Sequence, residues 1–165
     1  MRGLNNKKGQ QTMGLPFGMI FALILIVVFI VFAFIAIGGF LDIEPVIEVG
    51  LFYDELQAAV DDARSGQYTE ADFKIDLPSG IEKVCFANLS ARITPGKDAD
   101  ALDKYEVYDA NVFLIPPQAA GNLEFKLIRY INITKITESK NPYCVSVDVD
   151  LRIKKGFYDR LVTIE

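Results

Sequence analysis

One segment near the N-terminus is apolar on every side. From Met19 to Ile37 the chain has 19 consecutive apolar residues, without a Gly, Pro or polar side chain. A helix of this length spans about 28 Å at ~1.5 Å per residue, close to the ~30 Å hydrocarbon core of a bilayer. No polar residues recur at the helical spacing, so a helix in this segment would have no side that faces water. The pattern therefore predicts a transmembrane helix, which we place at residues 13–41.

A cleaved secretory signal is the alternative for this segment. Such signals have an apolar core of only about 7–15 residues, followed by a cleavage site of small residues. The run in this chain is longer, and the nearest site, Ala36-Ile37-Gly38, fits poorly. Its length therefore favours an uncleaved anchor.

The next segment has apolar residues at a helical period. Positions three or four apart form one apolar stripe: Val49, Phe52, Leu56, Ala59 or Val60, and Ala63. Pro45 suits the first turn of a helix, and Gly66 suits the position just after the last turn. The spacing predicts an amphipathic helix within residues 42–66. Gly38-Gly39 and Pro45 leave open whether it continues the span after a bend or follows a hinge.

After Gly66 the apolar residues alternate with polar ones, which is typical of strands. The alternation predicts a hairpin of residues 73–77 and 81–89 around Pro78-Ser79-Gly80, with an exposed loop at 94–104. Further strands are predicted at these ranges: 105–115, 123–133, 145–153 and 157–164. Arg129 interrupts the apolar face of strand 123–133, where it either pairs with a buried acid or extends along an edge to reach solvent.

These elements define the expected fold class. It is α+β, with an N-terminal transmembrane helix followed by an amphipathic helix packed on an antiparallel β-sheet of about five or six strands. Residues 67–165 form the β-rich domain. A small β-sandwich is the alternative architecture.

The distribution of charge orients the predicted anchor. Arg2, Lys7 and Lys8 precede the apolar segment, and the next basic residue is Arg64. The positive-inside rule therefore places residues 1–12 in the cytoplasm and residues 42–165 outside a single-pass cell membrane protein. The net charge of −5 argues against nucleic-acid binding. The expected partners are membrane lipid, and other envelope proteins or a second copy of the chain through the N-terminal helix.

Two short features fit this outside location. The only cysteines are Cys85 and Cys144, and an even number of cysteines in an oxidising compartment predicts a disulfide. The bridge would close a loop of about 59 residues and stabilise the fold by ~4 kcal/mol. Two unpaired buried thiols are the alternative. Asn88-Leu89-Ser90 and Asn132-Ile133-Thr134 fit the N-glycosylation pattern, with Asn132 on the polar face of its strand.

Candidate chemistry is limited by composition. The chain has no histidine, and two thiols without histidine supply only half a zinc site. Asp148 and Asp150 share a predicted strand face about 7 Å apart, which we interpret as a solvated face. Asp98, Asp100 and Asp103 lack the Gly and the distal Glu of a calcium loop. No catalytic residue, metal site or cofactor is therefore expected, and we predict a non-enzymatic protein.

A short motif precedes the apolar segment. Lys7-Lys8-Gly9-Gln10 is followed by Thr12 and then by the apolar run. The motif resembles the class III signal of archaeal type IV pilin-like proteins, in which a prepilin peptidase cuts after the Gly. The resemblance implies a leader at residues 1–9, cut between Gly9 and Gln10 beside Lys8. It also implies an N-terminal helix that anchors the protein and, after extraction, forms a filament core. Such pilins usually have Glu at the fifth mature position, where this chain has Gly14.

Two functions follow from these features. The first is a single-span, membrane-anchored extracytoplasmic domain with a structural or interaction role in the cell envelope. The alternative is a pilin-like filament subunit processed between Gly9 and Gln10.

Overall fold

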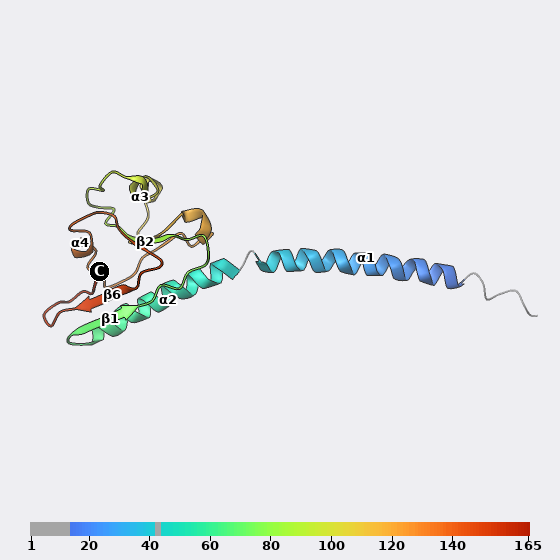
Figure 1. The fold of residues 1–165 in the computed structure, drawn as a ribbon, viewed down its shortest axis with the longest axis horizontal. Coiled ribbons are helices and arrows are strands. Elements are labelled where there is room, and N and C mark those ends of the chain that lie inside the picture. The colour runs from blue at the N-terminus through green and yellow to red at the C-terminus, as the bar shows by residue number, and fades with distance from the viewer. Residues whose placement is uncertain (1–13, 42–43) are drawn as a thin grey trace, which may run out of the picture. The chain divides into compact units, whose positions relative to one another are not determined.

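The computed structural model describes residues 14–41 and 44–165. The chain divides into two compact units, Met1–Asp42 and Ile43–Glu165, and we call residues 44–165 the head domain. In the first unit, α1 (Gly14–Leu41) is one helix of 28 residues (Figure 1). It is long and apolar enough to cross a membrane over Phe17–Gly38. The helix predicted at residues 13–41 is therefore confirmed.

The second predicted helix is also confirmed, as α2 (Glu44–Ser65). Pro45 lies in its first turn, where the missing N–H leaves no hydrogen bond unmade. One side of the helix is buried in the head domain through these residues: Val49, Phe52, Tyr53, Leu56, Val60 and Ala63. The predicted stripe is therefore correct, with Tyr53 as an addition and Ala59 only partly buried.

Seven short strands form two antiparallel sheets, and the α+β class is confirmed. The three-stranded sheet has the order β1 (Thr69–Phe73), β6 (Leu151–Lys155), β7 (Thr163–Ile164). The four-stranded sheet has the order β4 (Phe125–Lys126), β3 (Val112–Ile115), β2 (Lys83–Phe86), β5 (Tyr143–Ser146). The strands are thus divided between two sheets, where the sequence predicted a single sheet.

One hydrophobic core joins α2 to both sheets. Leu151 and Ile153 of β6, and Val84 and Phe86 of β2, pack in the same cluster as the buried stripe of α2. β1 and β6 lie beside α2, while α3 (Lys97–Asp100) lies on the other side of the head domain (Figure 1). The core therefore sits between one long helix and two short sheets.

A second, smaller core lies on the other face of the four-stranded sheet. It contains Cys85, Phe113, Leu102 and Tyr105. Because successive strand residues point to opposite faces, Val84 and Phe86 reach the main core while Cys85 reaches the smaller one. This arrangement explains why β2 is buried on both sides.

The segment predicted as an exposed loop at 94–104 covers this smaller core. It contains α3 and the start of a 3₁₀ helix, η1 (Asp103–Tyr105). Ala99 and Leu102 are buried within it. The prediction was wrong because these two apolar positions sit among acidic residues, which dominate the pattern. Two other short helices, η2 (Pro117–Ala120) and α4 (Ile133–Ile136), complete the head domain.

The predicted hairpin of residues 73–77 and 81–89 is absent from the described structure. β1 ends at Phe73 and pairs with β6, while β2 pairs with β3 and β5. Ile75 is still buried between exposed neighbours, so the alternation predicted burial correctly and pairing wrongly. The turn after Pro78 is present, and Gly80 adopts a φ of +103° that favours glycine.

The predicted strand 145–153 is divided between the two sheets. β5 ends at Ser146, β6 begins at Leu151, and a turn closed by a hydrogen bond from Val149 N to Ser146 O joins them. Asp148 and Asp150 therefore lie in this turn rather than on one strand face. Aspartate is unfavourable in strands and favourable in turns. The two aspartates therefore indicated a turn, but the alternating valines around them led to the prediction of a strand.

Three further strands are shorter than predicted. Residues 157–164 supply only β7, because a turn occupies the residues before it. Residues 105–115 supply only β3, because Tyr105 lies in η1. Residues 123–133 supply only β4, and Asn132 caps α4 through a hydrogen bond that its side chain accepts from Lys135 N. The expected polar strand face at Asn132 was therefore wrong. The backbone turns away at Tyr130, whose φ is +68°.

Candidate binding site

The cysteines predicted to pair are opposite one another. Cys85 of β2 and Cys144 of β5 are register partners in the four-stranded sheet, and a disulfide joins them. The bridge ties an inner strand to an edge strand beneath the segment that contains α3. Its place in the smaller core gives it a structural role.

The two predicted glycosylation asparagines line one polar cleft of about 460 Å³, together with Asn141. Asn88 Oδ1 accepts a hydrogen bond from Ser90 N at 3.1 Å, and Asn132 Oδ1 accepts one from Lys135 N at 3.1 Å. N-glycosylation modifies the nitrogen of the side chain, so these bonds leave the reacting atom free. Glycosylation of both residues stays a prediction. The predicted cleavage site at Lys8, Gly9 and Gln10 lies outside the described residues.

The acidic groups considered from the sequence are not brought together as a metal site in the described part of the chain. Asp98 is paired with Lys83 at 2.8 Å. Asp148 accepts a 3.4 Å hydrogen bond from Ser146 Oγ, and Asp150 is exposed.

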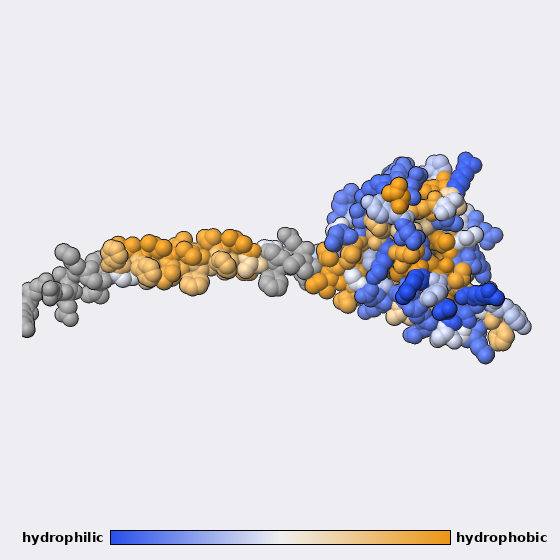
Figure 2. Space-filling model, turned by 180° about the vertical axis from the view of Figure 1, so that it is seen from behind, coloured by the Kyte–Doolittle hydropathy of each residue, from blue (hydrophilic) through white to orange (hydrophobic). Residues whose placement is uncertain are grey.

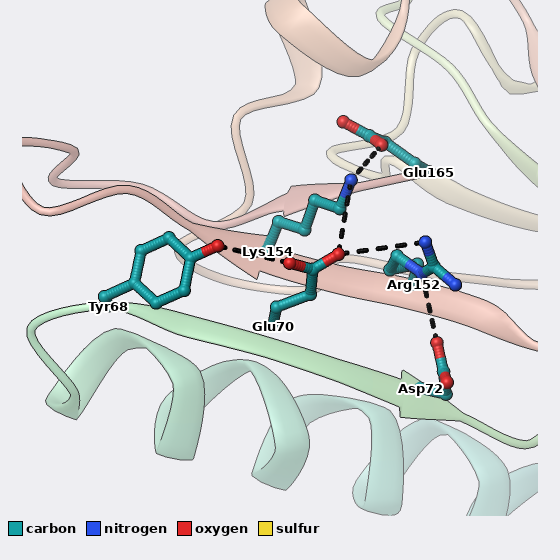
Figure 3. Close-up of polar contacts among 6 residues, drawn as sticks. All are labelled: Tyr68, Glu70, Asp72, Arg152, Lys154 and Glu165. Atoms are coloured by element: carbon teal, nitrogen blue, oxygen red, sulfur yellow. Dashed lines mark hydrogen bonds and ion pairs between the residues drawn. The ribbon is translucent and has the colours of Figure 1, made fainter.

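The outer face of the three-stranded sheet has a network of matched charges (Figure 3). Glu70 of β1 is the register partner of Lys154, and Asp72 is the partner of Arg152. The Arg152 Nε to Asp72 Oδ1 distance is 3.1 Å, and the Lys154 Nζ to Glu165 Oε2 distance is 2.8 Å. Hydrogen bonds to these carboxylates raise the pKa of both cations. Opposite charges directly across a strand pair stabilise that register.

A second charged network lies beside the smaller core. Tyr105 donates a hydrogen bond to Glu124, and Lys104 Nζ lies 2.9 Å from the same carboxylate. Burial, with the Glu124 bond, raises the pKa of Tyr105 to about 12. Burial also acts to raise the pKa of Glu124, but the hydrogen bonds from Tyr105 and Lys104 outweigh it and lower that pKa. Burial raises the pKa of the nearby Tyr53.

A cleft at the C-terminal end of α2 differs from both networks. It measures about 630 Å³ and is lined by these residues: Asp61, Arg64, Ser65, Arg129, Tyr130, Lys155, Asp159 and Arg160. Four of them are basic and two are acidic, within residues 42–165 that contain 14 basic and 22 acidic residues. We call it the basic cleft. Of these residues, Arg129 alone is noticeable in the sequence, because it interrupts an apolar alternation.

Within residues 44–165, the arginines of the basic cleft form no ion pair. The ion pairs within 4.0 Å in residues 44–165 involve five other cations: Lys83, Lys104, Lys126, Arg152 and Lys154. The guanidinium of Arg64 instead lies 3.9 Å from the centre of the Tyr130 ring, and that of Arg129 lies 5.9 Å from it. Both arginines are thus held near one aromatic ring.

The backbone around Tyr130 is held in place on both sides. Gln57 Oε1 accepts a hydrogen bond from Arg129 N at 2.8 Å, and Val162 N donates one to Tyr130 O at 2.9 Å. Tyr130 has a φ of +68°, a conformation that an aromatic residue adopts only where its surroundings impose it. The segment that presents Arg129 is therefore fixed in position.

Comparison with known protein families, curated proteins and solved structures finds no match to this chain. We therefore infer the function from the residues and their geometry.

Proposed function

We propose that the protein is a single-span membrane protein whose head domain faces outward and has a structural or interaction role in the cell envelope. The observation that carries the proposal is α1. Its window Phe17–Gly38 has a mean hydropathy of 3.5, and none of that window is buried within the structure (Figure 2). Soluble monomers rarely expose apolar surface of this extent, so a lipid environment is the natural partner of α1.

The outward orientation is supported by two separate features. Arg2, Lys7 and Lys8 precede α1, as the positive-inside rule requires of a cytoplasmic end. The Cys85–Cys144 disulfide fits an oxidising compartment. The raised pKa of Tyr105 and the lowered pKa of Glu124 both move away from neutrality, which agrees with a structural role for this hydrogen-bonded pair.

Protease accessibility tests this proposal. We expect protease added to intact cells to digest the head domain and to leave α1 in the membrane. A tag placed before Arg2 should be cut only after the cells are permeabilised. Digestion of the N-terminal tag in intact cells, with the head domain protected, would show the inverted orientation. Release of the full chain by alkaline carbonate would contradict the anchor.

We also propose, as the second candidate, a pilin-like filament subunit. It is supported by the order of the elements, in which an entirely apolar helix precedes an amphipathic helix packed on antiparallel strands. The N-terminal residue of the protein from its native membrane tests this candidate. A chain that begins at Gln10 supports it, and one that retains Arg2 contradicts it.

A further inference from the structure

We propose that the basic cleft binds an acidic sugar, with the sugar's carboxylate held by arginines and its hydroxyl groups bonded to the cleft's carboxylates. This proposal names a partner for the interaction role of the head domain, and rests on that role. Two sets of cations in the head domain differ. Arg152 and Lys154 are paired with carboxylates of their own chain (Figure 3), whereas Arg64, Arg129 and Arg160 form no ion pair within residues 44–165.

Two of these arginines lie near the same aromatic ring. Arg64 and Arg129 approach the same Tyr130 ring at 3.9 and 5.9 Å, and Arg160 lines the same cleft. Four cations and two carboxylates line the cleft, so it is positive overall in a chain of net charge −5. A bound anion would lower the repulsion among the arginines. The planar guanidinium matches a carboxylate in a two-pronged bond and still stacks on an aromatic face. The site is therefore suited to an oxyanion.

The site is also prepared in advance. Stacking on Tyr130 restrains the Arg64 side chain. The hydrogen bond that Gln57 accepts from Arg129 N and the one that Val162 N donates to Tyr130 O hold the Arg129–Tyr130 backbone. The buried Lys155 donates a hydrogen bond to Gly66 O at the end of α2, so its charge stays beneath the cleft. A site that is ordered before binding loses less entropy when the ligand arrives.

The carboxylates of the cleft favour a sugar over an acidic peptide. Asp61 and Asp159 line the same space as the arginines. They would repel a run of glutamate side chains, whereas sugar hydroxyls can donate hydrogen bonds to them. A volume of about 630 Å³ also exceeds what a single phosphate needs, and lies in the usual range of ligand pockets.

Two exposed aromatic residues belong to the loop that supplies Asp159 and Arg160 to the cleft. Phe157 and Tyr158 precede Asp159 and Arg160 in one loop, with their ring centres 5.0 Å apart. Phe157 is 60% exposed and Tyr158 is 92% exposed. The C–H face of a pyranose ring packs well on such rings, whose faces are electron-rich. An exposed aromatic pair in the loop that supplies two cleft residues thus agrees with a sugar ligand.

Calorimetric titration of the purified full chain, in a zwitterionic detergent without a sugar headgroup, tests the proposal. The probe is trigalacturonate, and the comparison ligands are neutral trigalactose, hexaglutamate and inorganic phosphate. We expect trigalacturonate to bind most tightly, and we expect its binding to weaken as salt screens the charges. Arg64→Gln with Arg129→Gln should weaken this binding at least tenfold. The matched control Arg92→Gln removes an exposed arginine outside the cleft and should leave binding unchanged.

Asp61→Asn separates the two kinds of ligand by the sign of its effect. It should weaken the binding of trigalacturonate, because the sugar hydroxyls lose an acceptor. It should strengthen the binding of hexaglutamate, because a repulsion between carboxylates is removed. Tighter binding of hexaglutamate or phosphate than trigalacturonate by the native chain would overturn the sugar assignment, as would no binding at all. Because the titration uses purified protein, failure here would leave the protease test of membrane orientation unaffected.

Discussion

α1 and the head domain use the same apolar residue types in opposite ways. In α1, from Phe17 to Gly38, every side chain is exposed within the structure. In α2 the apolar side chains of Phe52 and Leu56 are almost fully buried, while Ile47 and Leu51 on the other side are exposed. The apolar residue types do not distinguish the two helices. The polar positions do, because they recur along one side of α2 and are absent from α1. A helix without a polar side needs a partner outside the protein, whereas a helix with one stripe packs on its own sheets.

The largest expected effect comes from adding charge to α1. We expect the triple variant Ile24→Arg, Val28→Arg and Phe32→Arg to prevent stable membrane insertion. Three arginines near the centre of a span cost about 9 kcal/mol together, which exceeds the several kcal/mol gained by the apolar residues. Resistance of the protein to alkaline carbonate extraction measures the outcome.

The matched control adds the same charge to exposed apolar positions of the head domain. Ile47→Arg, Val107→Arg and Val149→Arg should leave membrane association unchanged, because these side chains are already exposed. Equal resistance to extraction in both triple variants would contradict the membrane role of α1.

The next effect concerns the disulfide that ties the smaller core together. We expect Cys85→Ala with Cys144→Ala to lower the stability of the head domain by about 4 kcal/mol, through the loop that the bridge closes. A domain of this size should then melt roughly 10 to 20 °C lower. Melting of the full chain without reductant measures the change.

Reduction of the native chain provides the control. It should lower the melting temperature by a similar amount, while leaving the double variant unaffected. Identical melting of the native chain with and without reductant would mean that the bridge does not stabilise the fold.

The sequence predicted the two long helices because the signal for each is local, whereas it missed the short helices α3, η1, η2 and α4. The stripe of α2 and the unbroken run of α1 depend only on neighbours within four positions. The disulfide was predictable from the even number of cysteines and from the charge asymmetry across α1. The strands were not, because pairing depends on residues far apart in the chain. Phe73 pairs with Leu151, and no local pattern indicates that partner.

The basic cleft illustrates the same limit at the level of the site. Its residues come from α2, from the segment around Tyr130, from the end of β6 and from the loop after it. Only Arg129 was noticeable in the sequence, since it interrupts an apolar alternation. Its prediction as a strand residue was wrong, because the positive φ of Tyr130 turns the chain at that point. A cluster assembled from four segments leaves no motif.

The two sides of α2 allow a direct test of burial. We expect Leu56→Ala to lower the free energy of unfolding by about 3 kcal/mol, because it removes buried contacts and leaves a cavity in the main core. Leu51→Ala is the matched control, since Leu51 is 56% exposed and its loss should cost less than about 0.5 kcal/mol. Chemical denaturation of the full chain measures both. Equal losses would mean that α2 does not pack on the sheets as described.

The smallest effect concerns the polar network beside the smaller core. α1 has no comparable network, because it contains no polar side chain. We expect Tyr105→Phe to lower stability at neutral pH by about 1.5 kcal/mol, because Glu124 loses a charge-assisted hydrogen bond. The difference from the native chain should then depend on pH. Denaturation curves between pH 3 and pH 12 (roughly the limits set by the two groups) measure it.

The direction of this dependence follows from the two pKa shifts. The lowered pKa of Glu124 gives stability above the carboxyl's ordinary pKa, and this stability is lost as pH falls through the folded-state value. The raised pKa of Tyr105, about 12, gives stability below the ordinary tyrosine pKa, and this is lost as pH rises toward 12. The native chain and the Tyr105→Phe variant should therefore differ most in stability near the middle of this pH range. Tyr158→Phe, at a 92% exposed ring, should show no such profile. A pH-independent difference for Tyr105→Phe would mean that its hydroxyl is not coupled to Glu124.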